Sequence, residues 1–368
     1  MMQVPFLDLK AAWQELSPQL REAVDQTLDS GYYIGGPALS EFEQAFSQFT
    51  DTHHTVGVGN GLDALRLVLE AMGIGPGDEV IVPSHTYIAT WLAVSQVGAT
   101  PIPVEPAPGL FTIDPQKIEA AITPATRAIM PVHLYGQPAD LDPILDLAVR
   151  FDLFVVEDAA QAQGAKYKGK RLGGHGHAVA WSFYPGKNLG AYGDAGAVTT
   201  NDDALAETIS MLGNYGSKVK YDHELPGCNS RLDPLQAAML KVKLSHLDVW
   251  NDRRRAIAER YTRELSDLPI KLPETKSWAD PVWHLYVICT AQRSALQAYL
   301  AENGIQTLLH YPKACFDQPA YAKYAVRGDE WPEARRIAAE ALSLPIGPHL
   351  SSDQVEHVIK AVRRFFGA

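Results

Sequence analysis

The sequence predicts an α/β protein whose mostly parallel sheet is covered by helices on both faces. From about residue 54, short β-rich segments alternate with helical stretches such as GLDALRLVLEAMG and YIATWLAVSQVG. Most of the short segments are apolar nearly throughout, without the polar alternation of a strand that faces water on one side. Apolar strands separated by helices are typical of parallel sheets that are buried on both faces.

Seven segments are predicted as the strands of this sheet. In chain order they are HTVGVG, EVIVPS, PIPVEP, RAIMPVHL, LFVVED, AVAWSF and GAVTT. In the first intervening helix, apolar residues recur at helical spacing and predict one buried stripe. These residues are Leu62, Leu65, Leu69 and Met72.

A second, smaller α/β unit is predicted at the carboxyl end. After residue 231 the pattern changes to long helix without an intervening strand, in LDPLQAAMLKVKLSHLDVWNDRRRAIAERYTREL. Beyond it, VWHLYVICT, QRSALQAYLAENG, IQTLLHYP and SSDQVEHVIKAVRRFF alternate strand and helix on a smaller scale. A chain of 368 residues also exceeds the length at which one hydrophobic core keeps growing. We therefore predict a large domain over residues 1–245 and a small domain over residues 246–368.

Composition argues against several classes of function. The chain has 32 basic and 43 acidic residues, a net charge of -11, and no basic run along one predicted helix, which argues against a nucleic-acid surface. No stretch offers the roughly 20 apolar residues of a membrane span, and the first residues lack a signal-peptide core. Three widely spaced cysteines without a CxxC pair favour free thiols in a reducing compartment. They are Cys228, Cys289 and Cys315. We expect a cytoplasmic protein that binds neither nucleic acid nor membrane.

The glycine-rich segment GNGLDA, residues 59–64, is a candidate phosphate site. It follows a strand and opens a helix, as G-x-G-x-x-G/A does in dinucleotide sites. The acids near the expected offset, Asp78 and Glu79, precede the next strand, whereas the dinucleotide motif needs an acid at the end of that strand. We therefore predict a phosphate site at the helix start without a dinucleotide. A glycine-rich turn without a ligand is the alternative.

Two further motifs are incomplete. GAKYKGKR, residues 164–171, begins like a P-loop but has Arg171 where that motif needs Ser or Thr, and no helix can start in the RLGGHGHA region. We interpret it as a turn. His175 and His177 have no third ligand in view, so they predict a solvated loop and no metal site.

A single lysine stands in the loop SFYPGKNLGAYGDAGAV, residues 182–198, which is rich in small residues. Upstream, the apolar strand LFVVED ends in Glu157 and Asp158, and a carboxylate buried there is unfavourable unless a partner pairs with it. In α/β sheets ligands bind at the edge where the parallel strands end. Placing Asp158 beside the end of AVAWSF brings Ser182 and Lys187 into the same crevice.

These groups are the ones that pyridoxal 5'-phosphate (PLP) requires. A lysine forms the Schiff base with PLP, an acid keeps the pyridine nitrogen protonated, and amide and hydroxyl groups bind the phosphate. The candidates are Lys187 for the Schiff base, Asp158 for the ring nitrogen, Gly61, Leu62 and Ser182 for the phosphate, and Tyr87 for stacking on the ring. Taken singly, each has a structural alternative: a surface lysine, a helix cap, an ordinary strand residue or a core aromatic residue.

Ten motifs, in order along the chain, carry a family resemblance. They are VPFLDLKAAW, GNGLDAL, GDEVIVPSHTYIAT, VHLYGQPADL, VEDAAQAQGA, SFYPGKNLGAYGDAGAV, NYGS, CNSRLDPLQAA, HYP and EALSLPIGPHL. With these motifs the chain resembles the DegT/StrS family of nucleotide-sugar aminotransferases over nearly its whole length. The resemblance implies a PLP enzyme of fold type I, like aspartate aminotransferase, with a seven-stranded sheet in its large domain. It also implies a homodimer whose active sites are shared between the subunits.

The same resemblance implies further site residues. Gln161 resembles the ligand of the PLP ring hydroxyl, and Asn229 resembles the residue that reaches the phosphate from the other subunit. His310 and Tyr311 resemble positions that line the sugar site, although a hydrogen-bonded histidine at a strand end is the alternative for His310. Tyr184, three residues before the lysine, is similar to members that act on 3-keto sugars, whereas members that aminate C4 tend to have histidine there.

The resemblance therefore implies transamination with glutamate as the amino donor. Lys187 is both the covalent anchor and the base that moves the α-proton. The expected substrate is a dTDP-linked 3-keto-6-deoxyhexose, aminated at C3 to give a dTDP-3-amino-3,6-dideoxyhexose. C3 amination of a UDP-linked keto-sugar and C4 amination of a 4-keto sugar are alternatives within the family, and a catalytically silent PLP-binding regulator is an alternative of another class. Lys187 argues against the related sugar dehydratases, which carry histidine there.

Overall fold

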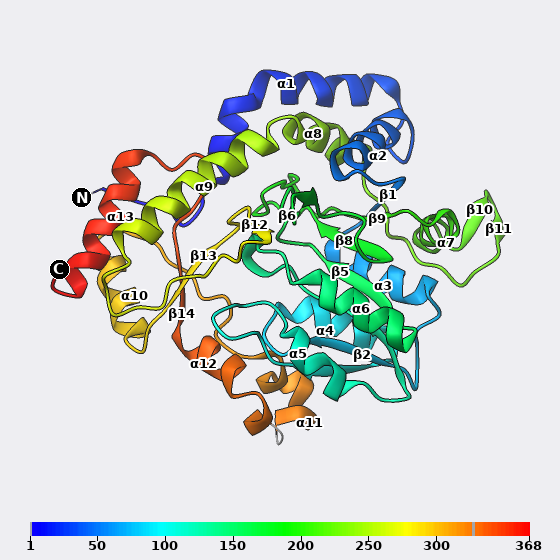
Figure 1. Cartoon of the computed structure of the whole chain (residues 1–368). Coiled ribbons are helices and arrows are strands. Elements are labelled where there is room, and N and C mark those ends of the chain that lie inside the picture. Colours follow the sequence, from blue (N-terminus) through cyan, green and yellow to red (C-terminus); the bar gives the residue numbers. More distant parts are fainter. Residues whose placement is uncertain (1, 326–327) are drawn as a thin grey trace.

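The central element of the fold is a seven-stranded sheet in the order β1-β9-β8-β5-β4-β2-β3. The computed structural model describes residues 2–325 and 328–368 (Figure 1). The strands are β1 (His54–Val58), β2 (Glu79–Pro83), β3 (Thr100–Val104), β4 (Thr126–Ile129), β5 (Phe154–Asp158), β8 (Ala178–Ser182) and β9 (Gly196–Thr200). Strand β9 runs antiparallel to β1 and β8, and the other paired strands run parallel. The seven predicted strands and the mostly parallel sheet are confirmed.

Helices cover this sheet and also form much of a smaller carboxyl-terminal unit beside it (Figure 1). They are α1 (Leu9–Ser30), α2 (Pro37–Thr50), α3 (Gly61–Ala71), α4 (Ile88–Gln96), α5 (Pro115–Ile118), α6 (Leu141–Phe151), α7 (Asp203–Gly213), α8 (Pro234–Leu244), α9 (Leu247–Glu264), α10 (Arg293–Glu302), α11 (Ala322–Ala325), α12 (Pro332–Glu340) and α13 (Ser352–Phe365). Short strands form the remaining pairs. They are β6 (Lys166–Tyr167), β7 (Lys170–Arg171), β10 (Ser217–Val219), β11 (Asp222–His223), β12 (Ala279–Asp280), β13 (Tyr286–Cys289) and β14 (Ala341–Leu344).

Strand β2 shows why the sheet segments lack polar alternation. Val80 and Val82 pack with α3 and α4 in one hydrophobic cluster, whereas Ile81 packs on the opposite side with Ile144 of α6. All four side chains are fully buried. Because both faces of the strand are removed from water, an apolar residue is favoured at every position.

Helix α3 begins directly after the glycine-rich segment. The side chain of Asn60 accepts a hydrogen bond from the Asp63 N–H (2.9 Å) and caps the helix. The predicted apolar stripe packs into the core, but Leu67 and Val68 beside it are also fully buried. The buried face of α3 is therefore wider than one stripe.

A smaller unit at the carboxyl end pairs β13 with β14 in an antiparallel ladder. Helices α10 and α13 pack there, and the start of the chain joins them, because Val4 forms a parallel bridge with Ile305. The long helical stretch predicted after residue 231 is two helices, α8 and α9, separated by Ser245 and His246. The domain boundary at residue 245 stays a prediction.

One segment of the carboxyl-terminal part packs on the large sheet. Phe316, Tyr321 and Trp331 lie in the same hydrophobic cluster as α3 and α4, and the Tyr321 ring lies 5.0 Å from the Trp91 ring, edge to face. Apolar contacts therefore join the two parts of the chain across the predicted boundary.

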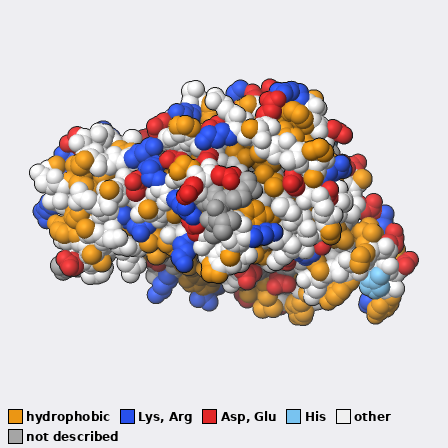
Figure 2. All heavy atoms as spheres, turned by 90° about the horizontal axis from the view of Figure 1, so that it is seen from below, with side chains coloured by type: hydrophobic (Ala, Val, Ile, Leu, Met, Phe, Trp, Pro, Cys, Tyr) orange, Lys and Arg blue, Asp and Glu red, His pale blue; other side chains and the backbone are white. Residues whose placement is uncertain are grey.

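Several segments singled out in the sequence have structural explanations. GAKYKGKR forms the β6–β7 hairpin, which confirms the predicted turn. Among residues 2–325 and 328–368, no group of three or more His, Cys, Asp or Glu side chains could hold a metal ion. The three cysteines are free. None of the described helices is long and apolar enough to cross a membrane. On the face seen in Figure 2, acidic and basic side chains are interspersed.

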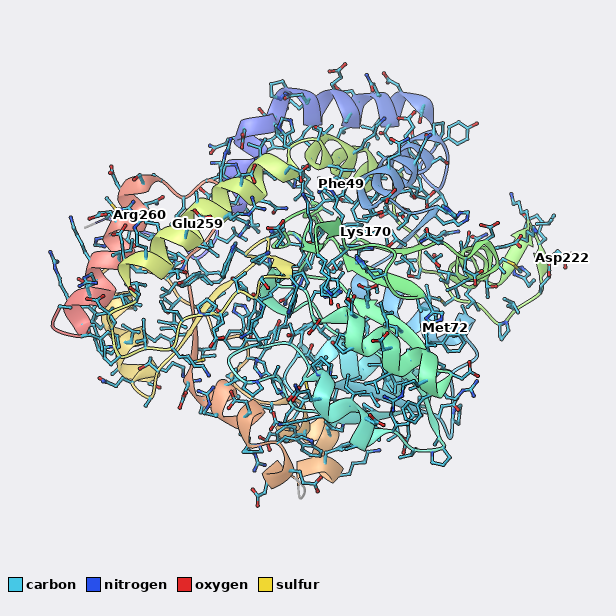
Figure 3. All side chains as sticks on the ribbon, in the orientation of Figure 1. Phe49, Met72, Lys170, Asp222, Glu259 and Arg260 are labelled. Atoms are coloured by element: carbon cyan, nitrogen blue, oxygen red, sulfur yellow. The ribbon has the colours of Figure 1, made fainter. Side chains whose placement is uncertain are left out.

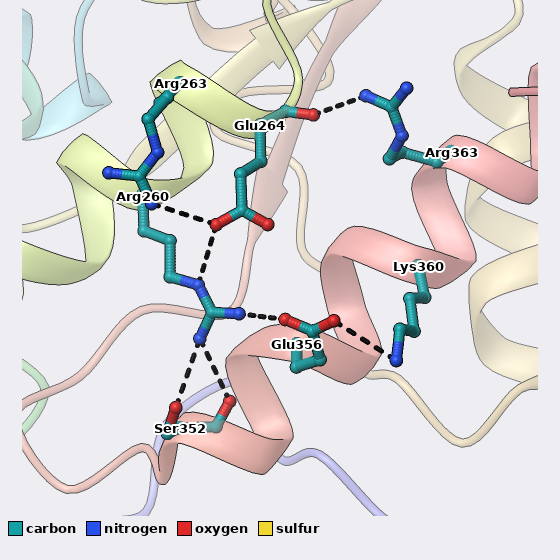
Figure 4. Close-up of polar contacts among 7 residues, drawn as sticks. All are labelled: Arg260, Arg263, Glu264, Ser352, Glu356, Lys360 and Arg363. Atoms are coloured by element: carbon teal, nitrogen blue, oxygen red, sulfur yellow. Dashed lines mark hydrogen bonds and ion pairs between the residues drawn. The ribbon is translucent and has the colours of Figure 1, made fainter.

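Ion pairs join α9 to α13 at the surface of the smaller unit (Figure 4). Arg260 on α9 donates from Nε to Glu264 (2.9 Å) and from Nη2 to Glu356 on α13. Arg363 on α13 donates to the Glu264 carbonyl (2.7 Å), and Lys360 pairs with Glu356 (3.2 Å). Arg260 is thus the residue that connects the carboxylates of both helices.

We expect Arg260→Ala to lower the free energy of unfolding by about 1 kcal/mol, because two ion pairs and the packed stem of the side chain are lost together. Arg263→Ala is the matched control, since the Arg263 side chain also contacts Glu264 (3.0 Å) but is 70% exposed, and it should have little effect. Urea denaturation of both variants measures the difference. Equal destabilisation would show that the helix-to-helix connection adds nothing.

Candidate active site

Lys187 lies in the loop that follows β8, and the next residue, Asn188, fixes the position of this loop. Asn188 is buried and donates from Nδ2 to Oδ1 of Asn251 on α9 (2.8 Å) and to the carbonyl of Val282 (2.9 Å). The Lys187 N–H itself donates to the Tyr184 carbonyl (2.8 Å) and closes a turn. The lysine is therefore held at a defined place beyond the end of the strand.

Lys187 and Asp158 act on each other electrostatically. Burial lowers the pKa of Lys187 to about 8. The negative charge of Asp158 raises this pKa, but its effect is smaller than that of burial. Burial raises the pKa of Asp158, although hydrogen bonds from the Ala160 N–H (3.1 Å) and Thr90 Oγ1 (2.9 Å) and the charge of Lys187 lower it. A lysine with a pKa near 8 has a substantial neutral fraction at physiological pH, as a nucleophilic amine requires.

The helix start and the end of β8 meet closely at Gly61. A Cβ atom on Gly61 would lie 2.6 Å from Ser182 Cβ, so only glycine allows this approach. Within the described chain, the N–H groups of Gly61 and Leu62 have no acceptor, and the Ser182 hydroxyl lies beside them. Free N–H groups at a helix start with a neighbouring hydroxyl form a suitable site for a phosphate.

Gln161 connects two tyrosines at the same edge of the sheet. Its Oε1 accepts a hydrogen bond from the Tyr135 N–H (2.6 Å), and its Nε2 donates to the Tyr311 hydroxyl (3.0 Å). The Tyr311 ring lies 5.4 Å from the ring of Tyr87, which immediately precedes α4. Tyr87 is 52% exposed, so its ring is available to a ligand.

His310 lies in the same region. Its Nδ1 lies 2.8 Å from Ser343 Oγ, and its carbonyl accepts a hydrogen bond from the Tyr135 hydroxyl. Burial, assisted by the charge of Lys187, lowers the pKa of His310 to about 4. The structure thus brings His310 near Lys187, as the sugar-site prediction requires. His310 is also hydrogen-bonded, as expected if its role is only structural.

Two predicted residues are less closely connected to this cluster. Tyr184 precedes Lys187 and is 59% exposed, with its N–H on Ser182 Oγ (3.3 Å). Asn229 is exposed and forms an isolated antiparallel bridge with Asn214. No side-chain contact links Asn229 to the other site residues among those described.

A sequence model described as the DegT/DnrJ/EryC1/StrS aminotransferase family matches residues 14–363. The chain belongs to this family.

The aminotransferase is similar to characterised proteins along nearly all of its length. It is 55% identical over 363 residues to the dTDP-3-amino-3,4,6-trideoxy-α-D-glucose transaminase of Streptomyces venezuelae, which covers 98% of this chain and 96% of that protein. Its fold matches the S. venezuelae DesV structure, solved in complex with a ketimine intermediate, with a TM-score of 0.98 and 54% identity over 100% of both chains. The predicted PLP fold type I is confirmed.

PLP is the cofactor of this aminotransferase family. NtdA from Bacillus subtilis, 32% identical with a TM-score of 0.93 over 100% of this chain and 86% of that one, was solved with bound PMP. The residues present in this aminotransferase fit the group. A partly buried lysine lies near a buried carboxylate, and any side chain at position 61 would fill the space between the start of α3 and Ser182.

Gly61→Ala is expected to weaken the binding of PLP by at least about tenfold, because the added methyl group must push Ser182 away from the helix start of the aminotransferase. Gly75→Ala is the matched control, since a Cβ there meets only the Val97 carbonyl at 3.6 Å, an ordinary contact. Fluorescence titration of the two cofactor-free variants with PLP measures both affinities. Equal affinities would contradict the assignment of this cradle to the phosphate.

Sequence reasoning missed two side chains that organise the site of the aminotransferase. Tyr135, at φ +60°, joins Gln161 to the His310 carbonyl, and His85 Nε2 lies 2.8 Å from its hydroxyl. Burial lowers the pKa of His85 to about 4. His85 lies two residues after the end of β2 and directly after the predicted strand EVIVPS, so its place at the carboxyl end of a strand is a signal that the sequence offered. Tyr135 directly follows the predicted strand RAIMPVHL and so offered the same signal, although β4 itself ends earlier, at Ile129.

Proposed function

We propose that the protein transfers an amino group from glutamate to C3 of a dTDP-linked 3-keto-6-deoxyhexose and releases a dTDP-3-amino-3,6-dideoxyhexose. The observation that carries this proposal is the 55% identity, over nearly the full length of both chains, to a transaminase that is named for a 3-amino dTDP-hexose. A partly buried lysine near a buried carboxylate supports the same chemistry.

We assign the residues of the cofactor site as follows. When bound, PLP supplies an electron sink for the carbon attached to the transferred nitrogen. Lys187 anchors the cofactor and Asp158 pairs with the ring nitrogen. Gly61, Leu62 and Ser182 bind the phosphate, Tyr87 stacks on the ring, and Gln161 binds the ring hydroxyl.

Lys187 is also the acid and base of the reaction. As a free amine, its Nζ takes the α-proton of glutamate, and in the second half-reaction it returns a proton to C3 of the sugar. Tyr184, His310 and Tyr311 are assigned to the sugar side of the site. The partial burial of this site limits water around the amine and keeps its pKa low.

The product of a defined reaction tests the substrate assignment. The protein, PLP and glutamate are incubated with a dTDP-3-keto-6-deoxyhexose, a UDP-linked 3-keto sugar or a dTDP-4-keto-6-deoxyhexose, and the products are analysed by NMR. We expect nitrogen on C3 of the first substrate. Turnover of only the UDP-linked sugar would reassign the nucleotide, turnover of only the 4-keto sugar would reassign the carbon, and no turnover of any would favour a silent regulator.

We further propose that the protein forms a homodimer whose active sites are shared between the subunits. We also propose that it is cytoplasmic. The β10–β11 hairpin, which carries Asp222 and projects from the body of the molecule (Figure 3), exposes 63% of Val219 and 83% of Tyr221. Asn229 follows this hairpin and is exposed too. Exposed apolar side chains beside a predicted phosphate ligand are consistent with a surface that a second subunit covers.

Mixing two inactive variants should restore activity if Asn229 serves the partner's site. Lys187→Ala and Asn229→Ala subunits are each expected to lose most activity. In a mixed dimer one site combines an intact Lys187 with an intact Asn229, so up to about a quarter of the wild-type activity should return after random exchange of subunits. Activity is measured after joint refolding. Absence of rescue, with Asn229→Ala alone severely impaired, would contradict the shared site.

A further inference from the structure

His284 lies beside the Lys187 loop and has no role in the proposal above. It belongs to the segment between β12 and β13, and a Cβ atom on Gly136 would lie 2.8 Å from its backbone nitrogen. Its Nδ1 lies 3.2 Å from Oδ1 of Asn188, the residue after Lys187. The buried guanidinium of Arg254 donates to the His284 carbonyl (3.4 Å). The backbone of His284 is therefore held between the turn at Gly136 and helix α9, and its ring contacts the lysine loop through Asn188.

Asn188 determines which ring nitrogen of His284 carries the proton. Its Nδ2 donates to the carbonyl of Val282, which can only accept, and to Oδ1 of Asn251. Turning the amide around would lose both bonds, so Oδ1 of Asn188 is the atom that faces the ring. Because that oxygen is an acceptor, Nδ1 of His284 donates to it. Neutral His284 then has an unprotonated Nε2.

The free nitrogen is accessible. Within the described parts of the chain, Nε2 has no hydrogen-bond partner. The atom is also not fully shielded from solvent. Burial, together with the positive charges of Lys187 and Arg254, lowers the pKa of His284 well below its ordinary value. His284, Lys187 and His310 act on one another electrostatically, and each keeps part of its surface exposed.

We propose that Nε2 of His284 accepts a hydrogen bond from the C2 hydroxyl of the hexose. An unprotonated ring nitrogen can bind only a donor. The inference rests on the proposed function, which brings C3 of the sugar to Lys187 and so brings the groups on the adjacent carbons within reach of His284. The proposed product and the 3-amino-3,4,6-trideoxyglucose named for the Streptomyces relative both retain the C2 hydroxyl, and only the former retains the C4 hydroxyl.

Two substitutions separate the two ring nitrogens. His284→Asn places an amide N–H at the position of Nδ1, which retains the bond to Asn188 and removes Nε2. His284→Gln reaches the position of Nε2 with an amide oxygen, which retains an acceptor and gives up the bond to Asn188. The two variants have similar polarity, so they serve as controls for each other.

The test is the equilibrium binding of two unreactive ligands, dTDP-6-deoxyglucose and dTDP-2,6-dideoxyglucose, to the protein loaded with pyridoxamine 5'-phosphate. The ligands differ only in the C2 hydroxyl, and neither has a ketone to react. Calorimetry should show that the wild-type protein binds the first about 3- to 10-fold more tightly, which is the effect of one neutral hydrogen bond. His284→Asn should bind both equally, and His284→Gln should keep part of the preference.

Other outcomes overturn the inference. A preference that persists in His284→Asn would mean that another residue contacts the C2 hydroxyl, and a wild-type protein without any preference would mean that none does. Failure of the wild-type protein to bind either ligand would contradict the proposed function as well. Nitrogen-15 NMR of histidine-labelled protein adds a measurement that needs no substitution: His284 should be protonated at Nδ1 only, and a proton on Nε2 would exclude it as an acceptor.

Discussion

Lys187→Ala is expected to abolish transamination while leaving a folded protein that still takes up PLP. Alanine provides no amine to anchor the cofactor and no base to move a proton between carbon atoms. A positioned general base alone contributes about 10²- to 10⁴-fold to a rate, and the covalent role adds to this. We therefore expect the turnover number to fall by at least about 10³-fold.

Two measurements and two controls make this result specific. Borohydride should fix the cofactor covalently to the wild-type chain, seen as a mass increase of the intact protein, and should fix none to the variant. Lys187→Arg retains the positive charge opposite Asp158 but cannot lose a proton to become a free amine, so it should be equally inactive. Lys170→Ala removes an exposed lysine of the β6–β7 hairpin (Figure 3) and should behave like wild type. Wild-type turnover by Lys187→Ala would refute the mechanism.

Asp158→Asn is expected to cost about 10²- to 10³-fold in turnover, because the carboxylate that we assign to the ring nitrogen becomes a neutral amide of nearly the same shape. A second effect concerns Lys187 in the cofactor-free protein. The negative charge of Asp158 raises the pKa of Lys187 against the larger effect of burial. Removing that charge should therefore move this pKa below its present value of about 8, so that Lys187 becomes neutral at lower pH.

The pH dependence of Lys187 acylation, followed by peptide mass analysis, measures this shift. Thr90→Val is the matched control, because it removes one hydrogen bond to Asp158 (2.9 Å) and keeps the charge. It should raise the pKa of Asp158 and leave most of the turnover. An unchanged acylation profile in Asp158→Asn would show that the two groups do not interact across the site.

The sheet could be predicted from the sequence because its strands are buried on both faces. At Val80, Ile81 and Val82 an apolar residue is required on each side, so the segment is apolar at every position and contrasts with its flanking turns. The candidate cofactor residues could be predicted for a related reason. Asp158 and Ser182 end strands, and the carboxyl ends of parallel strands meet at one edge.

The rest of the site depends on contacts between distant parts of the chain. His284 is brought to Lys187 by a hydrogen bond across 96 positions to Asn188, and the Tyr135 hydroxyl reaches a carbonyl 175 positions away. No local pattern encodes such pairs. The break between α8 and α9 was missed because the apolar spacing continues through Ser245 and His246, and neither residue is a glycine or proline.

The candidate groups around Lys187 have two structural origins. Those assigned to the cofactor come from the sheet edge and the start of α3, whereas His284 and His310 come from connecting segments of the carboxyl-terminal part. Mutations in these connections should leave the strands assigned to the cofactor in place, since loops tolerate change better than packed strands. On these assignments, substitutions in the connecting segments would change sugar preference while the amine chemistry is kept.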